Sequence, residues 1–134
     1  MTAENSKPDQ DVLRLLIVDD EEGYSRILSK RLERRNIQVC SALSGAEAIR
    51  LLRGREFDVA VLDLKMEDMD GIEVLKIFKK MDPDMPVIML TGHGSEDAMR
   101  EGAALGAFDY LSKPCDLSAL LEKIREAHKC RVSR

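Results

Sequence analysis

In LLIVDDE, residues 15–21, four apolar residues are followed at once by three acids. A short apolar run that ends in turn-forming residues is typical of a strand that helices bury on both faces. We therefore predict a strand over residues 13–18. Similar runs predict four further strands, over residues 38–42, 59–62, 87–91 and 108–112.

Amphipathic stretches lie between these runs and predict a helix after each strand. Residues 22–35 carry Ile27, Leu28 and Leu32 at helical spacing, which indicates one buried face. Ser44, followed three residues later by Glu47, has the form of a capping box at the start of a second helix. The three later helices are expected to begin after Asp70-Gly71, Ser95 and Asp116.

This alternation predicts an α/β fold of the (βα)5 type, a doubly wound, flavodoxin-like sheet of five parallel strands in the order 2-1-3-4-5. A chain of 134 residues can bury one core and leaves little for a second, so we expect a single domain. We place this domain at residues 11–130, with a disordered tail at residues 1–10 and a short C-terminal tail at residues 131–134.

The composition argues against several classes of protein. The formal net charge of −4 and the lack of a Lys/Arg block argue against direct nucleic-acid binding. The apolar runs are too short to cross a membrane and the N-terminus does not resemble a secretory signal, so we expect a cytoplasmic protein. Cys40, Cys115 and Cys130 stand at unrelated spacings and are expected to be reduced thiols.

Reactive side chains follow four of the five predicted strands. Doubly wound sheets bind their ligands beyond the carboxyl ends of the strands, so the residues at those ends are the candidates for a site. The first strand is followed by Asp19 and Asp20, the third by Asp63, the fourth ends at Thr91, and the fifth is followed by Lys113. Three carboxylates, one hydroxyl and one ammonium are thus expected to meet at one edge.

The chemistry of such a set favours phosphoryl transfer. Carboxylates at close quarters repel one another, and a hard divalent cation with oxygen ligands, Mg²⁺ above all, relieves that repulsion. Asp63 can then act as a carboxylate nucleophile that forms an acyl phosphate. Lys113 offers positive charge and Thr91 a hydroxyl to the phosphoryl oxygens, and these are the contributions that phosphoryl transfer requires.

Four motifs, taken together and in order, resemble the receiver domains of bacterial response regulators. They are LLIVDDE at 15–21, VLDL at 61–64 with MDG at 69–71, LTG at 90–92, and YLSKP at 110–114. The resemblance covers roughly residues 12–129 and includes the chemotaxis-regulator receiver fold. It implies a two-component signalling switch that catalyses only its own phosphorylation and slow autodephosphorylation, and is otherwise not an enzyme.

The resemblance also implies a role for each site residue. Asp63 is the implied acceptor of a phosphoryl group from the phosphohistidine of a sensor histidine kinase or phosphotransfer protein. Mg²⁺ or Mn²⁺ would be bound by Asp20, by Asp63, by the backbone carbonyl of Lys65, and by Asp19 through a water.

Further implied features concern the output. Thr91 and Tyr110 are the implied switch pair, which reshapes the face formed by the fourth helix, fifth strand and fifth helix. This face would bind a downstream effector domain or protein, and the resemblance allows phosphorylation-dependent homodimers. Lys113-Pro114 resembles the family's cis peptide bond. Lys65 and His93 fill positions that tune phosphoryl lifetime, and we hypothesise that they influence how an attacking water is placed.

One position departs from the family pattern. The family usually has proline after the residue that is here Met66, whereas this chain has Glu67. The substitution predicts a loop after Asp63 that is more acidic or more mobile. Asp68 and Asp70 in the same loop are interpreted as turn and cap residues outside the site.

Other interpretations of these residues remain open from the sequence. Asp19, Asp20 and Asp63 are each compatible with a turn or helix cap, and Tyr110 with a core aromatic. A pseudo-receiver that docks without taking phosphate would share the fold, as would a flavodoxin-like or phosphatase-like enzyme. The enzyme would need a phosphate-binding glycine loop after the first strand, or an aspartate at position 65, where this chain has lysine. The domain either stands alone or is part of a longer regulator.

Overall fold

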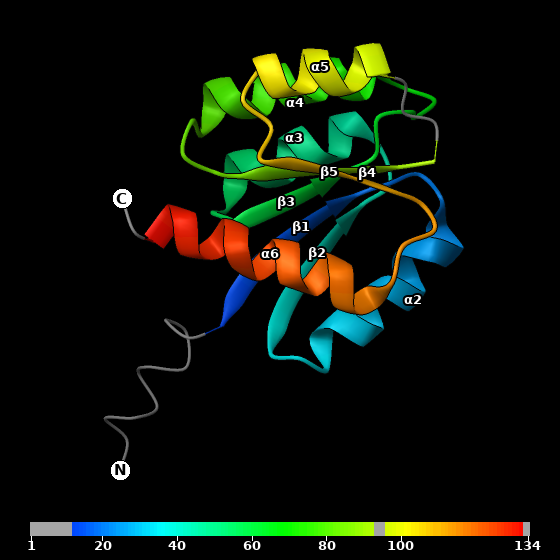
Figure 1. The fold of residues 1–134 in the computed structure, drawn as a ribbon, viewed down its shortest axis with the longest axis vertical. Coiled ribbons are helices and arrows are strands. Elements are labelled where there is room, and N and C mark those ends of the chain that lie inside the picture. The colour runs from blue at the N-terminus through cyan, green and yellow to red at the C-terminus, as the bar shows by residue number, and fades with distance from the viewer. Residues whose placement is uncertain (1–11, 93–95, 133–134) are drawn as a thin grey trace.

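A computed structural model describes residues 12–92 and 96–132 and shows a single parallel sheet covered by helices (Figure 1). The strands lie in the order β2-β1-β3-β4-β5 and all neighbours are parallel, which confirms the predicted topology. Their bounds are β1 (Leu13–Val18), β2 (Ile37–Ala42), β3 (Val59–Leu62), β4 (Val87–Thr91) and β5 (Asp109–Ser112).

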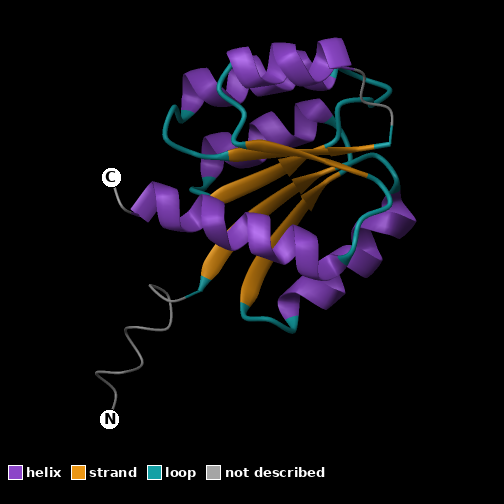
Figure 2. Ribbon diagram, in the orientation of Figure 1, coloured by secondary structure: helices purple, strands orange, loops and turns teal. Residues whose placement is uncertain are grey.

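A helix follows each strand, so the order of elements is βα repeated along the chain (Figure 2). The bounds are α2 (Glu22–Glu33), α3 (Gly45–Gly54), α4 (Gly71–Met81), α5 (Glu96–Ala104) and α6 (Leu117–Val132). In Figure 1, α2 and α6 cover one face of the sheet, and α3, α4 and α5 cover the other. None of the helices in the described ranges is long and apolar enough to span a membrane.

The two faces of the sheet bury separate apolar clusters. On β1, Leu16 and Val18 point into the cluster beneath α3 and α4, whereas Leu15 and Ile17 point into the one beneath α2 and α6. Every residue of β3 and of β4 is buried. Because the central strands are covered on both sides, their sequences are continuously apolar instead of alternating.

The predicted buried face of α2 is wrong at one position. Ile27 is 58% exposed, whereas Leu28 and Leu32 are buried as expected and Ser25 is buried beside them. The helix also ends at Glu33, two residues before the predicted end at 35. Asn36 then adopts a positive φ of 64°, a left-handed conformation that asparagine tolerates better than most residues and that takes the chain out of the helix.

The capping box predicted at α3 forms with one change. The Ser44 side chain accepts a hydrogen bond from the Glu47 N–H at 3.1 Å, as expected. The Glu47 carboxylate, however, accepts from the Leu43 N–H at 2.8 Å instead of the Ser44 N–H. The Glu47 carboxylate thus satisfies the N–H of the residue before the N-cap instead of the N–H of the N-cap itself.

The last helix extends beyond the domain boundary placed at residue 130. α6 continues to Val132, and the Arg131 guanidinium lies 3.2 Å from the Asp82 carboxylate at the end of α4. This ion pair gives the last turn of α6 a partner outside its own helix. The N-terminal tail at 1–10, residues 133–134 and the Ser95 cap lie outside the described residues. All three cysteines are free.

Arg14 on β1 and Asp58 before β3 form a cluster of hydrogen bonds at the opposite end of the sheet from the acidic strand ends. The Asp58 carboxylate accepts from the Arg14 backbone N–H at 2.8 Å and from its guanidinium at 3.2 and 3.3 Å. Burial alone would raise the pKa of Asp58, but the hydrogen bonds from Arg14 outweigh it and hold this pKa below its usual value.

We predict that Asp58→Asn lowers the free energy of unfolding by about 1 to 2 kcal/mol at neutral pH, because a hydrogen bond to a charged partner is lost. Since the folded-state pKa of Asp58 is lowered, its contribution is present above the unfolded value of about 3.9 and disappears as pH falls through the folded value. Urea unfolding at pH 7 and in acid should show the difference between the two proteins shrinking.

The control is Glu73→Gln, which removes an exposed pair with Lys76 on α4 and should change stability by less than about 0.5 kcal/mol. Equal stability of Asp58→Asn and the unaltered protein at pH 7 would contradict the prediction.

Candidate functional site

The carboxyl ends of β1 and β3 bring three acids together. Val18 pairs with Leu62 in the parallel register, and the Asp63 N–H donates to the Val18 carbonyl at 2.9 Å. Asp19, Asp20 and Asp63 each place one carboxylate oxygen so that all three lie within 4.8 Å of one another. Asp19 and Asp63 are each only 4% exposed. The acids predicted at the strand ends are thus neighbours in space.

Lys113, which follows β5, reaches into this group of acids. Its Nζ lies 2.6 Å from Asp19 Oδ2, 2.7 Å from Glu21 Oε1 and 3.5 Å from Asp63 Oδ2. The ammonium also sits over the ring of Tyr24, 4.5 Å from its centroid. Burial alone would lower the pKa of Lys113, but hydrogen bonds to the Asp19 and Glu21 carboxylates outweigh it and raise this pKa, so the side chain carries a fixed positive charge.

The charge balance of the site favours a bound cation. Burial raises the pKa of Asp19, and the nearby Asp63 carboxylate adds to the rise, although hydrogen bonds from Lys113 and the Glu21 N–H oppose it. The Lys113 ammonium therefore faces more than one carboxylate. The atoms that the acidic cluster offers to a metal ion are all carboxylate oxygens. Oxygen donors in such a cluster fit a hard divalent cation such as Mg²⁺ or Mn²⁺.

Thr91 and Tyr110 lie on the two neighbouring strands β4 and β5. Thr91 is fully buried at the end of β4 and pairs with Ser112 on β5, and Tyr110 on β5 pairs with Met89 on β4. The Tyr110 hydroxyl accepts from the Ser112 hydroxyl at 3.4 Å. Lys113-Pro114 is a cis peptide bond, as the resemblance implied. His93 lies outside the described residues.

The loop between β3 and α4 is held by contacts on both sides of Asp63. The Lys65 N–H donates to Asp63 Oδ1 at 3.2 Å, and Lys65 forms a backbone bridge with Asp70. Asp70 caps α4 through the Ile72 N–H at 2.9 Å, as predicted. Gly71 is required here, since a Cβ would lie 2.4 Å from Leu64 Cα. The start of α4 therefore packs directly against the backbone beside Asp63.

Asp68 contacts residues far from it in the sequence, whereas a local turn or cap role was expected for it. Its carboxylate accepts from the N–H groups of Gly45 and Ala46 at 3.0 and 3.1 Å, at the start of α3. The Gly45 N–H is the main reason why the pKa of Asp68 is lowered. Asp68 thus caps a helix that lies more than twenty residues earlier in the sequence.

Sequence reasoning missed Glu21 and Tyr24 as neighbours of the site, and it missed the contact of Asp68 with the start of α3. Glu21 was available as the third acid of LLIVDDE, but an acid at that position equally suits the start of a helix. Tyr24 carried no signal, because its contact with Lys113 joins residues nearly ninety positions apart.

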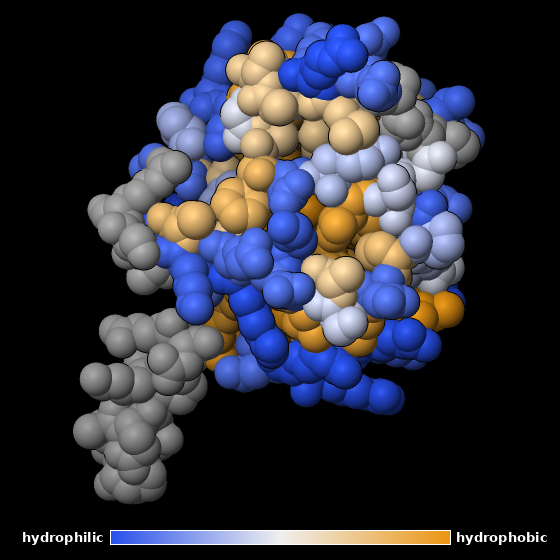
Figure 3. All heavy atoms as spheres, in the orientation of Figure 1, coloured by the Kyte–Doolittle hydropathy of each residue, from blue (hydrophilic) through white to orange (hydrophobic). Residues whose placement is uncertain are grey.

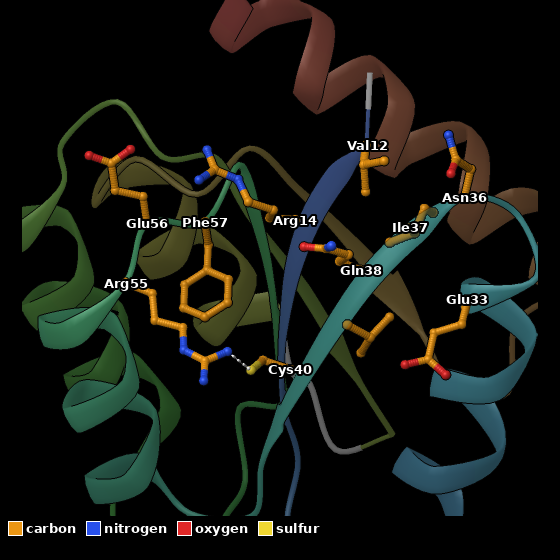
Figure 4. Close-up of a pocket in the computed structure, with 11 residues that line it drawn as sticks. Val12, Arg14, Glu33, Asn36, Ile37, Gln38, Cys40, Arg55, Glu56 and Phe57 are labelled. Carbon is orange, nitrogen blue, oxygen red and sulfur yellow. Dashed lines mark hydrogen bonds between the residues drawn. The ribbon is translucent and has the colours of Figure 1, made fainter. Parts of the chain in front are cut away.

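A hollow of about 590 Å³ lies at the other end of the sheet, away from these acids (Figure 4). It is lined by the starts of β1 and β2 and by the segment before β3, where Arg55 donates to the Cys40 sulfur at 2.9 Å. None of Asp19, Asp20, Asp63 and Lys113 lines it. Since doubly wound sheets bind ligands at the carboxyl ends of their strands, we assign the candidate site to the acids.

The fold and the acidic strand ends define a flavodoxin-like α/β domain with a candidate cation site. The model of the response regulator receiver domain family matches residues 15–125 of this chain. The chain therefore belongs to the response regulator receiver domains, the receiving modules of two-component signalling.

A curated relative contains a similar domain as part of a longer protein. The chain is 40% identical over 113 residues to the transcriptional regulatory protein GlrR of Escherichia coli K12, covering 84% of this chain and 26% of that protein. It thus spans about a quarter of the length of the curated relatives it matches first.

Two solved structures are similar throughout the domain. A CheY-like receiver domain protein from Methanospirillum hungatei JF-1 is 32% identical, with a TM-score of 0.89 over 91% of this chain and 98% of that one. A response regulator from Burkholderia pseudomallei, solved with a phosphorylated aspartic acid, a calcium ion and citrate, is 26% identical. Its TM-score is 0.81, over 90% of this chain and 72% of that one.

We predict that Mg²⁺ stabilises the folded protein and that this effect depends on the acidic cluster. A ligand at about one hundred times its Kd adds roughly 2.7 kcal/mol to the free energy of unfolding, which raises the melting temperature. Without Mg²⁺, Asp20→Asn and Asp63→Asn should melt at a higher temperature than the unaltered protein, because the repulsion among the carboxylates is reduced. When Mg²⁺ is added, the melting temperature of these variants should rise less than that of the unaltered protein. Calorimetric melting with and without MgCl₂ measures both effects.

Asp70→Asn is the matched control, because it changes an acid in the same loop that caps α4 and lies outside the cluster. It should keep the full Mg²⁺ effect. A melting temperature of the unaltered protein that does not respond to Mg²⁺ would refute a cation site here.

Proposed function

We propose that this receiver domain is a phosphorylation switch in which Asp63 accepts a phosphoryl group from the phosphohistidine of a sensor histidine kinase or phosphotransfer protein. The observation that carries the proposal is the setting of Asp63. Its carboxylate is 4% exposed, belongs to a cluster of three acids, and lies 3.5 Å from the Lys113 ammonium. A nucleophile beside both a cation site and a fixed positive charge suits phosphoryl transfer.

In the proposed reaction an Asp63 oxygen attacks phosphorus, the phosphorus–nitrogen bond breaks, and the histidine imidazole leaves with the bonding electrons. The product is an acyl phosphate on Asp63. Asp20, Asp63 and the Lys65 carbonyl, with Asp19 through a water, would hold Mg²⁺ or Mn²⁺, which would supply positive charge that neutralises the phosphoryl oxygens. Lys113 is already charged and needs only to exchange a carboxylate partner for a phosphoryl oxygen.

The Burkholderia pseudomallei relative supports this proposal. That protein was solved with a phosphorylated aspartic acid and a calcium ion, and its fold matches this chain with a TM-score of 0.81. Calcium and magnesium are both hard cations with oxygen ligands. The combination of modified aspartate and cation in a relative is the chemistry proposed for the acidic cluster of this chain.

The proposed output is a change in the face formed by α5, β5 and α6. Thr91 would move toward the phosphoryl group and the Tyr110 ring would turn inward, both being on strands that border this face. The face lies toward the viewer in Figures 1 and 3, and its surface mixes polar with smaller apolar areas. Such a surface suits a partner that binds reversibly.

The proposed partners of this face are an effector domain or protein, or a second phosphorylated copy of the chain. Beyond its own phosphorylation and slow autodephosphorylation we assign no enzymatic activity. We propose a cytoplasmic protein that contacts neither nucleic acid nor membrane through this domain.

We predict that incubation with Mg²⁺ and acetyl phosphate adds one phosphoryl group to the protein, seen by intact-mass spectrometry. Asp63→Asn should gain none, because the amide cannot act as the nucleophile. Asp58→Asn, an acid at the far end of the sheet, should gain as the unaltered protein does. If the unaltered chain takes no phosphoryl group from acetyl phosphate or from a cognate kinase, the domain is a pseudo-receiver and the proposal fails.

We also predict that Lys65→Ala and His93→Ala change the rate at which the acyl phosphate hydrolyses. Lys65 is exposed directly beside the acceptor and its own N–H donates to Asp63. The decay of the phosphorylated mass after removal of the donor measures this rate. Lys76→Ala, on the surface of α4, is the control. Hydrolysis rates of Lys65→Ala and His93→Ala equal to that of Lys76→Ala would refute a role for both residues.

A further inference from the structure

Glu67 forms a direct link between two loops of the site. Its backbone N–H donates to Asp20 Oδ2 at 3.0 Å, although the two residues are 47 positions apart. Glu67 belongs to the loop after β3, and Asp20 to the loop after β1. The contact therefore joins the segment that carries Asp63 to a second member of the acidic cluster.

The donor of this hydrogen bond is held in place from both sides. Before it, the Met66 side chain is buried against the cluster under α3 and α4. After it, the Asp68 carboxylate accepts the two hydrogen bonds from the start of α3. The Glu67 side chain itself is exposed. The backbone at residue 67 is thus fixed while its side chain is not, so the N–H can act as a preorganised donor.

Asp20 is the member of the cluster with most need of such a donor. Asp19 and Asp63 are buried, whereas Asp20 is half-buried at the edge of the site. Repulsion from the other two carboxylates favours rotation of Asp20 toward solvent. A hydrogen bond to one carboxylate oxygen opposes that rotation and leaves the lone pairs of the other oxygen for a cation.

We propose that Glu67 is a positioning residue whose backbone N–H holds the Asp20 carboxylate in the orientation that binds the divalent cation. This inference rests on the cation site of the proposed function. It also gives a physical meaning to the departure from the family pattern, because proline at this position has no N–H to donate. In this chain the loop is tied to Asp20 by a contact that proline could not make.

The test compares Glu67→Pro with Glu67→Ala in the full chain. Both variants lack the glutamate carboxylate, but only Glu67→Ala keeps the N–H. Isothermal titration with MgCl₂ at about 0.15 M salt should give a Kd for Glu67→Pro roughly two- to tenfold weaker than for Glu67→Ala, the cost of ordering one side chain on binding. Glu67→Ala should stay within about twofold of the unaltered protein, because an exposed charge is screened at this salt.

A second measurement needs no proline. Amide hydrogen exchange of the Glu67 N–H, followed by NMR, should be faster in Asp20→Ala than in the unaltered protein, since its acceptor is removed. Glu22→Ala, an exposed acid in the first turn of α2, should leave that exchange rate unchanged.

The outcomes separate the two claims. This inference would be overturned by equal Mg²⁺ affinity of Glu67→Pro and Glu67→Ala, or by an exchange rate of the Glu67 N–H that is the same in Asp20→Ala and in the unaltered protein. Either result would leave the proposed function intact. Absence of Mg²⁺ binding by the unaltered chain would overturn both.

Discussion

Repulsion among three carboxylates is the constraint around which this domain is arranged. The parallel register of β1 and β3 places Asp19, Asp20 and Asp63 within 4.8 Å of one another, two of them out of water. A group of this kind costs free energy unless donors and positive charge surround it. The chain supplies both, through the Lys113 ammonium and through backbone N–H groups of the loops after β1 and β3. One ammonium stands against these three carboxylates and Glu21, which is consistent with the proposed cation site.

The rest of the fold holds this unfavourable arrangement together. Two apolar clusters clamp β1, β3 and β4 from both faces, so the strand ends cannot separate to relieve the repulsion. Close-packed interiors deform little, and a rigid frame lets the loops beyond it carry charge at close quarters. Stability is thus concentrated in the sheet and its helices, and reactivity in the segments that leave the sheet.

Much of the fold could be predicted from sequence because its signals are local. β1, β3 and β4 end where an apolar run meets a polar residue, whereas the less buried edge strands β2 and β5 each differ by one residue from their predicted start. The site acids followed from the convergence of parallel strand ends. The contacts of Glu21 with Lys113 and of Asp68 with α3 could not be predicted, because they depend on the path of loops that no pattern specifies.

The close packing of Gly71 against Leu64 makes the surroundings of Asp63 differ from one side to the other. On that side the start of α4 is in close contact with the backbone of Leu64, so this backbone has no space to move toward the helix. On the other side stands Lys113, one of whose partners, Glu21, is 63% exposed and can be exchanged for water at little cost. The surroundings of Asp63 are therefore rigid on the side of α4 and more easily rearranged on the side of Lys113. A charge added to Asp63, as the proposed phosphorylation would add, would therefore act more on Lys113, which follows β5, than on the start of α4.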